Sequence, residues 1–196
     1  MRYRELMIAT SSEGKIIELS ALLSPIRLIR PPKVLNIEEG PCSYLENAYL
    51  KARSYFEEFK IPALAEDSGL EVSALGGMPG VFSSRFSELE FGGKESETGT
   101  AANIRKLLRL MEGKEDRSAL FRCVLLIYDS EGGLWAQGVC RGEITTIPRG
   151  ARGFGYDPIF KPLGEDRTMA ELTAEEKNAI SHRGIAARRL LELLSG

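Results

Sequence analysis

Two adjacent carboxylates, Glu66 and Asp67, are the residues of this chain whose type and spacing most directly suggest chemistry. They follow the apolar run of residues 61–65 and precede a glycine-rich turn at residues 76–80. An apolar run that leads directly into charges predicts a buried strand that carries the two acids at its end. Open α/β sheets bind their ligands at such strand ends. Because adjacent carboxylates need solvent, a counter-charge or a cation, the pair predicts either a cation site or a solvated turn.

A polar loop near the N-terminus has the composition of an anion-binding site. Residues 10–15 read TSSEGK and lie between an expected strand at residues 6–9 and an expected helix at residues 16–23. Such a loop offers backbone N–H groups and the positive end of a helix to an anion. It is not a Walker A loop, because Ala9 and Ile16 occupy the positions of that motif's first glycine and its Ser/Thr. A capped helix start without a ligand is the alternative interpretation.

A second glycine-rich segment, residues 148–160, reads PRGARGFGYDPIF. Its glycines allow a ligand to approach the backbone closely, its arginines can pair with phosphate, and its aromatic rings can stack on a base. The segment lacks the third glycine of a dinucleotide fingerprint, since Pro158 stands in that place. It therefore indicates either a loop that holds a flat anionic ligand or a surface turn with two core aromatics.

The overall composition limits the possible functions. The 196 residues are 43% hydrophobic and carry a formal net charge of -2, which predicts one globular domain over residues 1–196 without a duplex-binding surface. Three widely spaced cysteines argue against a disulfide framework and a zinc site, and so favour a reducing cytoplasm. The single histidine, His182, excludes a His-rich centre, so any metal is expected to be oxygen-bound Mg²⁺ or Mn²⁺. No segment approaches the ~20 apolar residues of a membrane span.

The elements that must position these residues follow from periodicity. Helices are expected at residues 16–23, 43–59, 98–111 and 185–194, and strands at residues 6–9, 26–30, 61–65, 117–128 and 134–147. Ser43 and Glu46 have the spacing of a capping box, as do Thr168 and Glu171. The last two strands are joined by a glycine-containing turn, which predicts a hairpin. The pattern therefore indicates an α/β fold with a mixed central sheet flanked by helices.

Five segments, in this order, resemble the motifs of the inosine triphosphate pyrophosphatase family. Residues 7–15, MIATSSEGK, are similar to its strand followed by TGNxxK, and residues 44–52 to its FxENAxxKA. Residues 66–85 resemble its DDSGLxVxALxGxPGxxSxR. The motifs PRGxxGFGYDPIF and AELxxxEKNxISHRGxA are present without a gap at residues 148–160 and 170–186. The resemblance covers nearly the whole chain.

The resemblance implies hydrolysis of dITP, ITP and XTP to the monophosphate and pyrophosphate, with Mg²⁺ or Mn²⁺ as cofactor. It implies that Asp67 is the catalytic acid/base group and that Glu46, Glu66 and Asp67 hold the metal. The residues implied to bind the substrate are Thr10, Ser11, Ser12, Glu13, Gly14, Lys15, Ser68, Phe154, Gly155, Tyr156, Asp157, Lys177, His182 and Arg183. It also implies a long mixed sheet, two lobes with an active-site cleft between them, and a homodimer without nucleic-acid or membrane partners.

Two departures from the family pattern bear on these roles. Ser11 and Ser12 replace the family's Gly-Asn in the phosphate loop, and Glu66 replaces the first Asp of the acidic pair. A related pyrophosphatase for other modified nucleotides is one alternative function. A nucleotide sensor that has lost hydrolysis is another, which the altered loop favours and the intact Glu46, Glu66 and Asp67 oppose.

Overall fold

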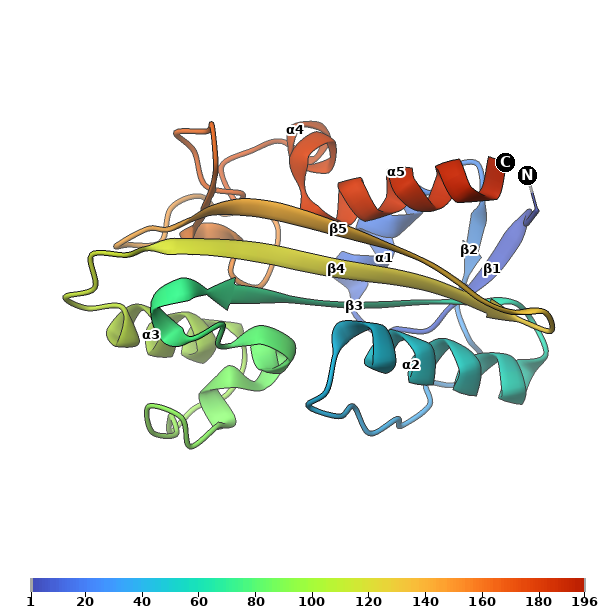
Figure 1. Ribbon diagram of the computed structural model, residues 1–196, viewed down its shortest axis with the longest axis horizontal. Coiled ribbons are helices and arrows are strands. Elements are labelled where there is room, and N and C mark those ends of the chain that lie inside the picture. Colours follow the sequence, from blue (N-terminus) through green and yellow to red (C-terminus); the bar gives the residue numbers. More distant parts are fainter. Residues whose placement is uncertain (1, 196) are drawn as a thin grey trace. The chain divides into compact units, whose positions relative to one another are not determined.

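The computed structural model describes residues 2–195. Its helices are α1 (Glu13–Leu22), α2 (Tyr44–Phe59), α3 (Thr100–Leu110), α4 (Ala174–Ile180) and α5 (His182–Ser195), with 3₁₀ segments η1 (Ser73–Leu75), η2 (Gly80–Glu88) and η3 (Asp157–Ile159). Its strands are β1 (Glu5–Ile8), β2 (Arg27–Ile29), β3 (Ala63–Val72), β4 (Ser118–Asp129), β5 (Gly132–Ile144) and β6 (Phe160–Pro162). They form one sheet in the order β2-β1-β3-β4-β5-β6 (Figure 1). Since β1 pairs in parallel with β2 and β3 while β5 and β6 are antiparallel, the expected mixed α/β sheet is confirmed.

The chain divides into two compact units. Unit 1 contains the residues up to Asp67, Cys123–Val139, and the residues from Ser181 on; unit 2 contains Ser68–Arg122 and Cys140–Ile180. The strands β3, β4 and β5 each contribute residues to both units. We describe each unit by itself.

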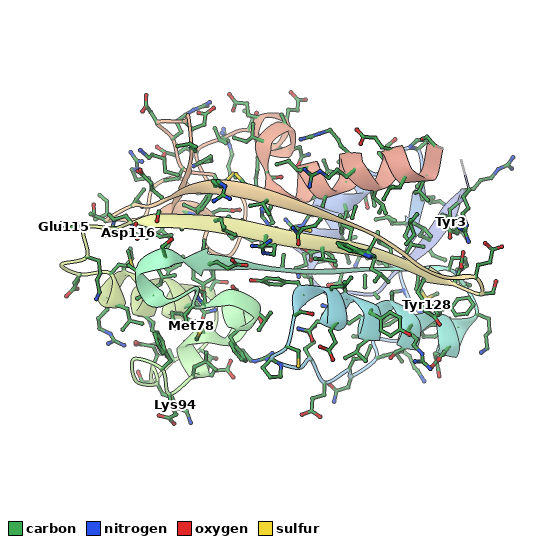
Figure 2. All side chains as sticks on the ribbon, in the orientation of Figure 1. Tyr3, Met78, Lys94, Glu115, Asp116 and Tyr128 are labelled. Atoms are coloured by element: carbon green, nitrogen blue, oxygen red, sulfur yellow. The ribbon has the colours of Figure 1, made fainter. Side chains whose placement is uncertain are left out.

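Unit 1 has helices on both faces of its strands. α1 and α5 share a core with one face of the strands, and this core includes Leu19, Leu64, Leu125 and Leu190. Tyr128 of β4 turns to the other face, where its ring packs against Tyr49 and Phe56 of α2 at centroid distances of 5.5 and 5.7 Å (Figure 2). The alternation follows from the strand geometry, in which successive side chains point to opposite faces.

Unit 2 has a separate core in which α3 packs against the η2 segment. Leu107 of α3 and Phe86 of η2 are both fully buried there. The ammonium group of Lys106, also fully buried, donates hydrogen bonds to the carbonyl oxygens of Phe86 and Leu89 at 2.9 and 2.6 Å. Lys106 therefore satisfies backbone acceptors where the η2 segment ends.

Several local predictions are confirmed and others are wrong. The Ser43 hydroxyl caps α2 by accepting from the Glu46 N–H at 3.1 Å, and β4 and β5 are neighbours joined by the two residues 130–131. The predicted capping box at Thr168 does not begin a helix. Instead, Thr173 and Glu176 exchange both capping hydrogen bonds at the start of α4.

Two element boundaries change the interpretation of the site. α1 begins at Glu13 and not at residue 16, so Lys15 belongs to its first turn and not to a loop. β3 runs to Val72, so the prediction that Glu66 and Asp67 lie at a strand end is wrong; they lie in its middle. The alternating side chains that follow them, Leu70 and Val72, are buried in unit 2, and this burial extends the strand. No helix among residues 2–195 is long and apolar enough to cross a bilayer.

Candidate active site

Glu66 and Asp67 point to opposite faces of β3. The Glu66 carboxylate contacts Lys15 of α1 and Arg183 of α5, whereas the Asp67 carboxylate contacts Lys51 of α2. Neighbouring residues of a strand project in opposite directions, so two acids in the middle of β3 cannot share one point. The structure thus separates the two carboxylates that the sequence places side by side.

Asp67 is held by two side chains of α2. Lys51 donates to its Oδ1 at 3.0 Å and Asn47 to its Oδ2 at 3.2 Å, from positions four residues apart on one helix face. Asp67 is only 5% exposed. Burial raises the pKa of its carboxyl above the usual value, and the nearby Lys51 ammonium opposes that rise.

Lys51 is the main functional candidate that the sequence argument missed. Besides Asp67 it contacts the Glu39 carboxylate at 2.8 Å and the carbonyl oxygen of Glu66 at 2.9 Å. Asn47 in turn exchanges hydrogen bonds with the backbone of Gly40, which fixes the loop that carries Glu39. Two signals in the sequence could have found it: Lys51 is the lysine of the motif FxENAxxKA, and its spacing from Asn47 puts both residues on one face of α2.

Glu46 precedes Asn47 on α2 and is exposed. It lines a cavity of about 440 Å³ whose other lining residues are Ser43, Leu45, Tyr49, Leu126, Gly133 and Trp135. Among residues 2–195, no three acidic, histidine or cysteine side chains converge as a ready metal site. The structure therefore does not gather Glu46, Glu66 and Asp67 around one ion.

On the opposite face of β3, Glu66 lies in a buried charged cluster that also contains Lys15, Glu18, Cys123 and Arg183. Lys15 Nζ lies 2.6 Å from Glu66 Oε2, and Arg183 Nη2 lies 2.8 Å from Oε1. Arg183 also pairs with Glu18 of α1 at 2.5 Å, and the Cys123 thiol donates weakly to Glu66 Oε1 at 3.6 Å. Burial raises the pKa of that thiol well above its usual value, so it stays protonated.

The phosphate-loop residues surround the start of α1. Ser12 is the residue that precedes the helix, and its N–H bonds to the hydroxyl of Thr10 at 3.2 Å. Glu13, Gly14 and Lys15 form the first turn, whose N–H groups lack partners within the helix. Ser11 is exposed, and Glu13 pairs with Arg30 on the surface. The helix start thus combines backbone donors that the helix itself does not use with the Lys15 ammonium.

His182 and Arg183 form the first turn of α5. The Ser181 hydroxyl caps this helix by accepting from the Gly184 N–H at 3.1 Å. His182 is 4% exposed and Arg183 2%. Two nitrogens of the Arg183 guanidinium are engaged by carboxylates, so this arginine anchors α5 to α1 and β3.

In unit 2, Asp157 contacts two other predicted residues, Phe154 and Lys177. Its Oδ2 accepts from the Phe154 N–H at 2.8 Å and from Lys177 Nζ at 2.5 Å. Lys177 lies over the Phe154 ring, 5.0 Å from its centroid. A Cβ added at Gly153, where φ is +72°, would lie 2.1 Å from Asp157 Oδ2. The glycine therefore leaves room for this compact arrangement.

The other predicted residues of unit 2 have different surroundings. Tyr156 is buried, and its hydroxyl donates to the carbonyl oxygen of Ser83 at 2.9 Å. Burial raises the pKa of this phenol. Gly155 has a φ of +61°, and Ser68 is half-buried in β3 directly after Asp67. The predicted site residues of unit 1 thus lie on two faces of β3, and in unit 2 only Phe154 and Lys177 contact Asp157.

The chain matches known proteins over nearly its full length. Residues 6–193 match the model of the Ham1 family. The dITP/XTP pyrophosphatase of Aquifex aeolicus is 53% identical, with 97% of this chain and 96% of that protein covered, and the dITP/XTP pyrophosphatase of Bacillus licheniformis is 43% identical, with 97% and 98% covered. The solved Ham1 protein of Staphylococcus aureus is 35% identical and superposes with a TM-score of 0.82 over 98% of both chains.

Proposed function

The chain belongs to the Ham1 family, and from this premise we propose that it hydrolyses dITP, ITP and XTP to the monophosphate and pyrophosphate. The observation that carries the proposal is the full-length identity of 53% to a dITP/XTP pyrophosphatase. The resemblance in five motifs that the sequence showed is therefore confirmed at the level of the family. The reaction removes non-canonical purine nucleotides from the triphosphate pool.

Asp67 is the residue best placed to activate water. Its buried carboxylate is oriented from two directions by Lys51 and Asn47, and its raised pKa makes it a stronger base than an exposed aspartate. In the proposed step, Asp67 takes the proton of the attacking water. The water oxygen forms a bond to the α-phosphorus, the bond from that phosphorus to the oxygen bridging the α- and β-phosphates breaks, and the bridging oxygen leaves with pyrophosphate.

Glu46 and Asp67 are the oxygen ligands that suit Mg²⁺ or Mn²⁺. One or two carboxylates are sufficient, because Mg²⁺ takes its remaining ligands from water and substrate phosphates. Glu39 adds negative charge beside Lys51, close to Asp67. A bound ion would supply positive charge to the phosphate oxygens and lower the pKa of a water. Glu66 does not fit this set, since it faces the other side of β3 with its oxygens on Lys15 and Arg183.

The remaining residues divide between the triphosphate and the base. The start of α1, with residues 10–15, would bind the phosphates through N–H groups and Lys15. Phe154 and Asp157, together with Lys177, would hold the purine in a cleft of a two-lobed molecule. Donors from His182, Arg183 or a backbone N–H would pair with the 6-oxo group, and the 6-amino group of adenine would then oppose a donor.

The exposed Cys42 is a free thiol, which fits the cytoplasm.

Pyrophosphate release from ITP and ATP, with and without Mg²⁺, tests the proposal. We expect pyrophosphate from ITP and XTP, little turnover of ATP, and loss of activity in EDTA that Mg²⁺ or Mn²⁺ restores. Orthophosphate as the first product, or equal rates on ITP and ATP, would contradict it. Faster turnover of a modified pyrimidine triphosphate would favour the related pyrophosphatase, and binding of ITP without turnover would favour the sensor. Light scattering of the eluting protein tests the expected homodimer.

A further inference from the structure

We propose that Glu66 is a positioning residue: it fixes Lys15 and Arg183 for the substrate and is not a ligand of the metal. The inference rests on the proposed function for the identity of the substrate. It also assigns the first member of the acidic pair a task different from that of Asp67. Glu66 and the residues that it contacts all belong to unit 1.

The Glu66 carboxylate has both of its oxygens engaged by cations. Oε2 lies 2.6 Å from Lys15 Nζ, and Oε1 lies 2.8 Å from Arg183 Nη2 and accepts the weak hydrogen bond of the Cys123 thiol. An ion that bound Glu66 would have to displace a cation from either oxygen, whereas an ion that bound Asp67 would displace only the neutral Asn47 amide from Oδ2. The Glu66 side chain is also fully buried, so it could replace a lost partner with water only by opening the core.

The two cations come from segments distant in sequence. Lys15 is in the first turn of α1, and Arg183 is in the first turn of α5. Arg183 also pairs with Glu18 one turn further along α1, so two carboxylates and two cations alternate across α1, β3 and α5. Glu66 is the member that contacts both cations. It therefore sets the position of one helix start relative to the other.

The arrangement leaves Lys15 able to bind an anion. Its side chain is 21% exposed, whereas those of Glu66 and Arg183 are 0% and 2% exposed. An ammonium group has three N–H donors, more than a contact to one carboxylate oxygen can use. The carboxylate thus holds the buried side of the ammonium group while the other side faces solvent at the start of α1. A phosphate chain at that helix start would meet an ammonium group already oriented.

Two binding measurements without turnover test the proposal. The first is the affinity for Mn²⁺ alone, by electron paramagnetic resonance of the free ion. The second is the affinity for inorganic tripolyphosphate in EDTA, by calorimetry. We expect Glu66→Gln to keep its Mn²⁺ affinity within two-fold of the parent and to bind tripolyphosphate at least ten-fold more weakly. We expect Glu46→Gln to show the reverse pattern. A loss of Mn²⁺ affinity in Glu66→Gln as large as that in Glu46→Gln would overturn the proposal.

A mutant cycle shows whether Glu66 acts through Lys15. In a Lys15→Met background, Glu66→Gln should weaken tripolyphosphate binding by less than two-fold, because Lys15 is the group through which Glu66 acts on the phosphates, and the probe carries no base for Arg183 to contact. Additive losses would overturn the proposal. Asp129→Asn, a change in another buried contact of unit 1, is the control for a merely structural effect and should leave tripolyphosphate affinity unchanged.

If Glu66→Gln does not fold, Glu66→Asp takes its place. It keeps the charge but shortens the arm by one methylene, so it cannot keep both contacts at their present lengths unless α1 or α5 shifts. We expect weaker tripolyphosphate binding with unchanged Mn²⁺ affinity, and the opposite result would overturn the proposal. Neither probe is a substrate. A parent protein that fails to hydrolyse ITP would therefore contradict the proposed function, while the two binding measurements would still test the role of Glu66.

Discussion

Gly138 of β5 lies directly against the backbone of His182, the first residue of α5. A Cβ built on Gly138 would be 2.0 Å from the carbonyl oxygen of His182 and 2.5 Å from the backbone nitrogen of Ala186. Backbone atoms cannot move aside as a flexible side chain can. The absence of a side chain at position 138 therefore allows α5 to approach β5, and this approach places Arg183 within reach of Glu66.

Gly138→Ala should displace the start of α5. Overpacking of this kind costs about 1–3 kcal/mol, which corresponds to a fall in Tm of about 2–12 °C for a chain of this size. ITP affinity should fall as well, since His182 and Arg183 move with the helix. Gly133→Ala on the same strand is the matched control, because its Cβ would meet nothing closer than 3.9 Å. Equal Tm values for the two variants, by calorimetry, would contradict the close approach.

Asp67→Asn should abolish turnover while preserving substrate binding. The amide cannot accept the proton of water, and loss of a general base typically lowers kcat by ~10²–10⁴. KM for ITP should change far less, because the groups proposed to hold the base and phosphates are elsewhere. Asp116→Asn, in an exposed turn before β4, is the control and should keep the parent's kcat (Figure 2). A kcat within a few-fold of the parent for Asp67→Asn would move the catalytic role to another acid.

Lys177→Met should destabilise unit 2 and weaken ITP binding. The change leaves the Asp157 carboxylate, whose side chain is 4% exposed, without its cation. Removing one partner of a buried ion pair costs about 3–5 kcal/mol, or about 6–20 °C in Tm. KM for ITP should rise because Phe154 loses the ammonium group over its ring. Lys161→Met, which breaks a partly exposed pair with Glu143, should change stability by less than about 1 kcal/mol.

Asp129 should make a pH-dependent contribution to stability. Burial alone would raise the pKa of its carboxyl, but hydrogen bonds from Tyr3 and the Glu131 N–H, and the charge of Arg2, bring it below the usual value. A lowered pKa in the folded state means that the contribution is present above the unfolded value of about 3.9 and is lost as pH falls through the folded value. Figure 2 labels Tyr3, whose hydroxyl donates to the Asp129 carboxylate.

Urea unfolding of Asp129→Asn between pH 7 and pH 3 checks this expectation. Near neutral pH, the free energy of unfolding of the parent should exceed that of the variant by about 1–3 kcal/mol. This is the usual cost of leaving buried polar partners without their acceptor. The difference should shrink as pH approaches 3. Asp166→Asn, an exposed site, is the control and should differ little from the parent at any pH. A difference that grows on acidification would contradict the sign of the shift.

Interactions between residues that are close in the sequence predicted much of this structure. The Ser43 cap, the hairpin of β4 and β5, and the amphipathic pattern of α3 depend on residues a few positions apart, so the sequence contains the whole interaction. The family motifs likewise predicted the residues of the candidate site. The predicted start of α1 was wrong, because the helix begins three residues before its apolar pattern does. No helix was predicted over α4, whose capping residues are Thr173 and Glu176.

The partners of the acidic pair were decided by the tertiary structure. Glu66 meets Arg183, 117 residues away, and Asp67 meets Lys51, 16 residues away on the other face of the strand. The sequence by itself determined that two carboxylates would be adjacent and that α2 would carry Asn47 and Lys51 on one face. Only the tertiary structure placed the acids in mid-strand and turned them apart, because the length of β3 depends on the distant strands and cores that bury it.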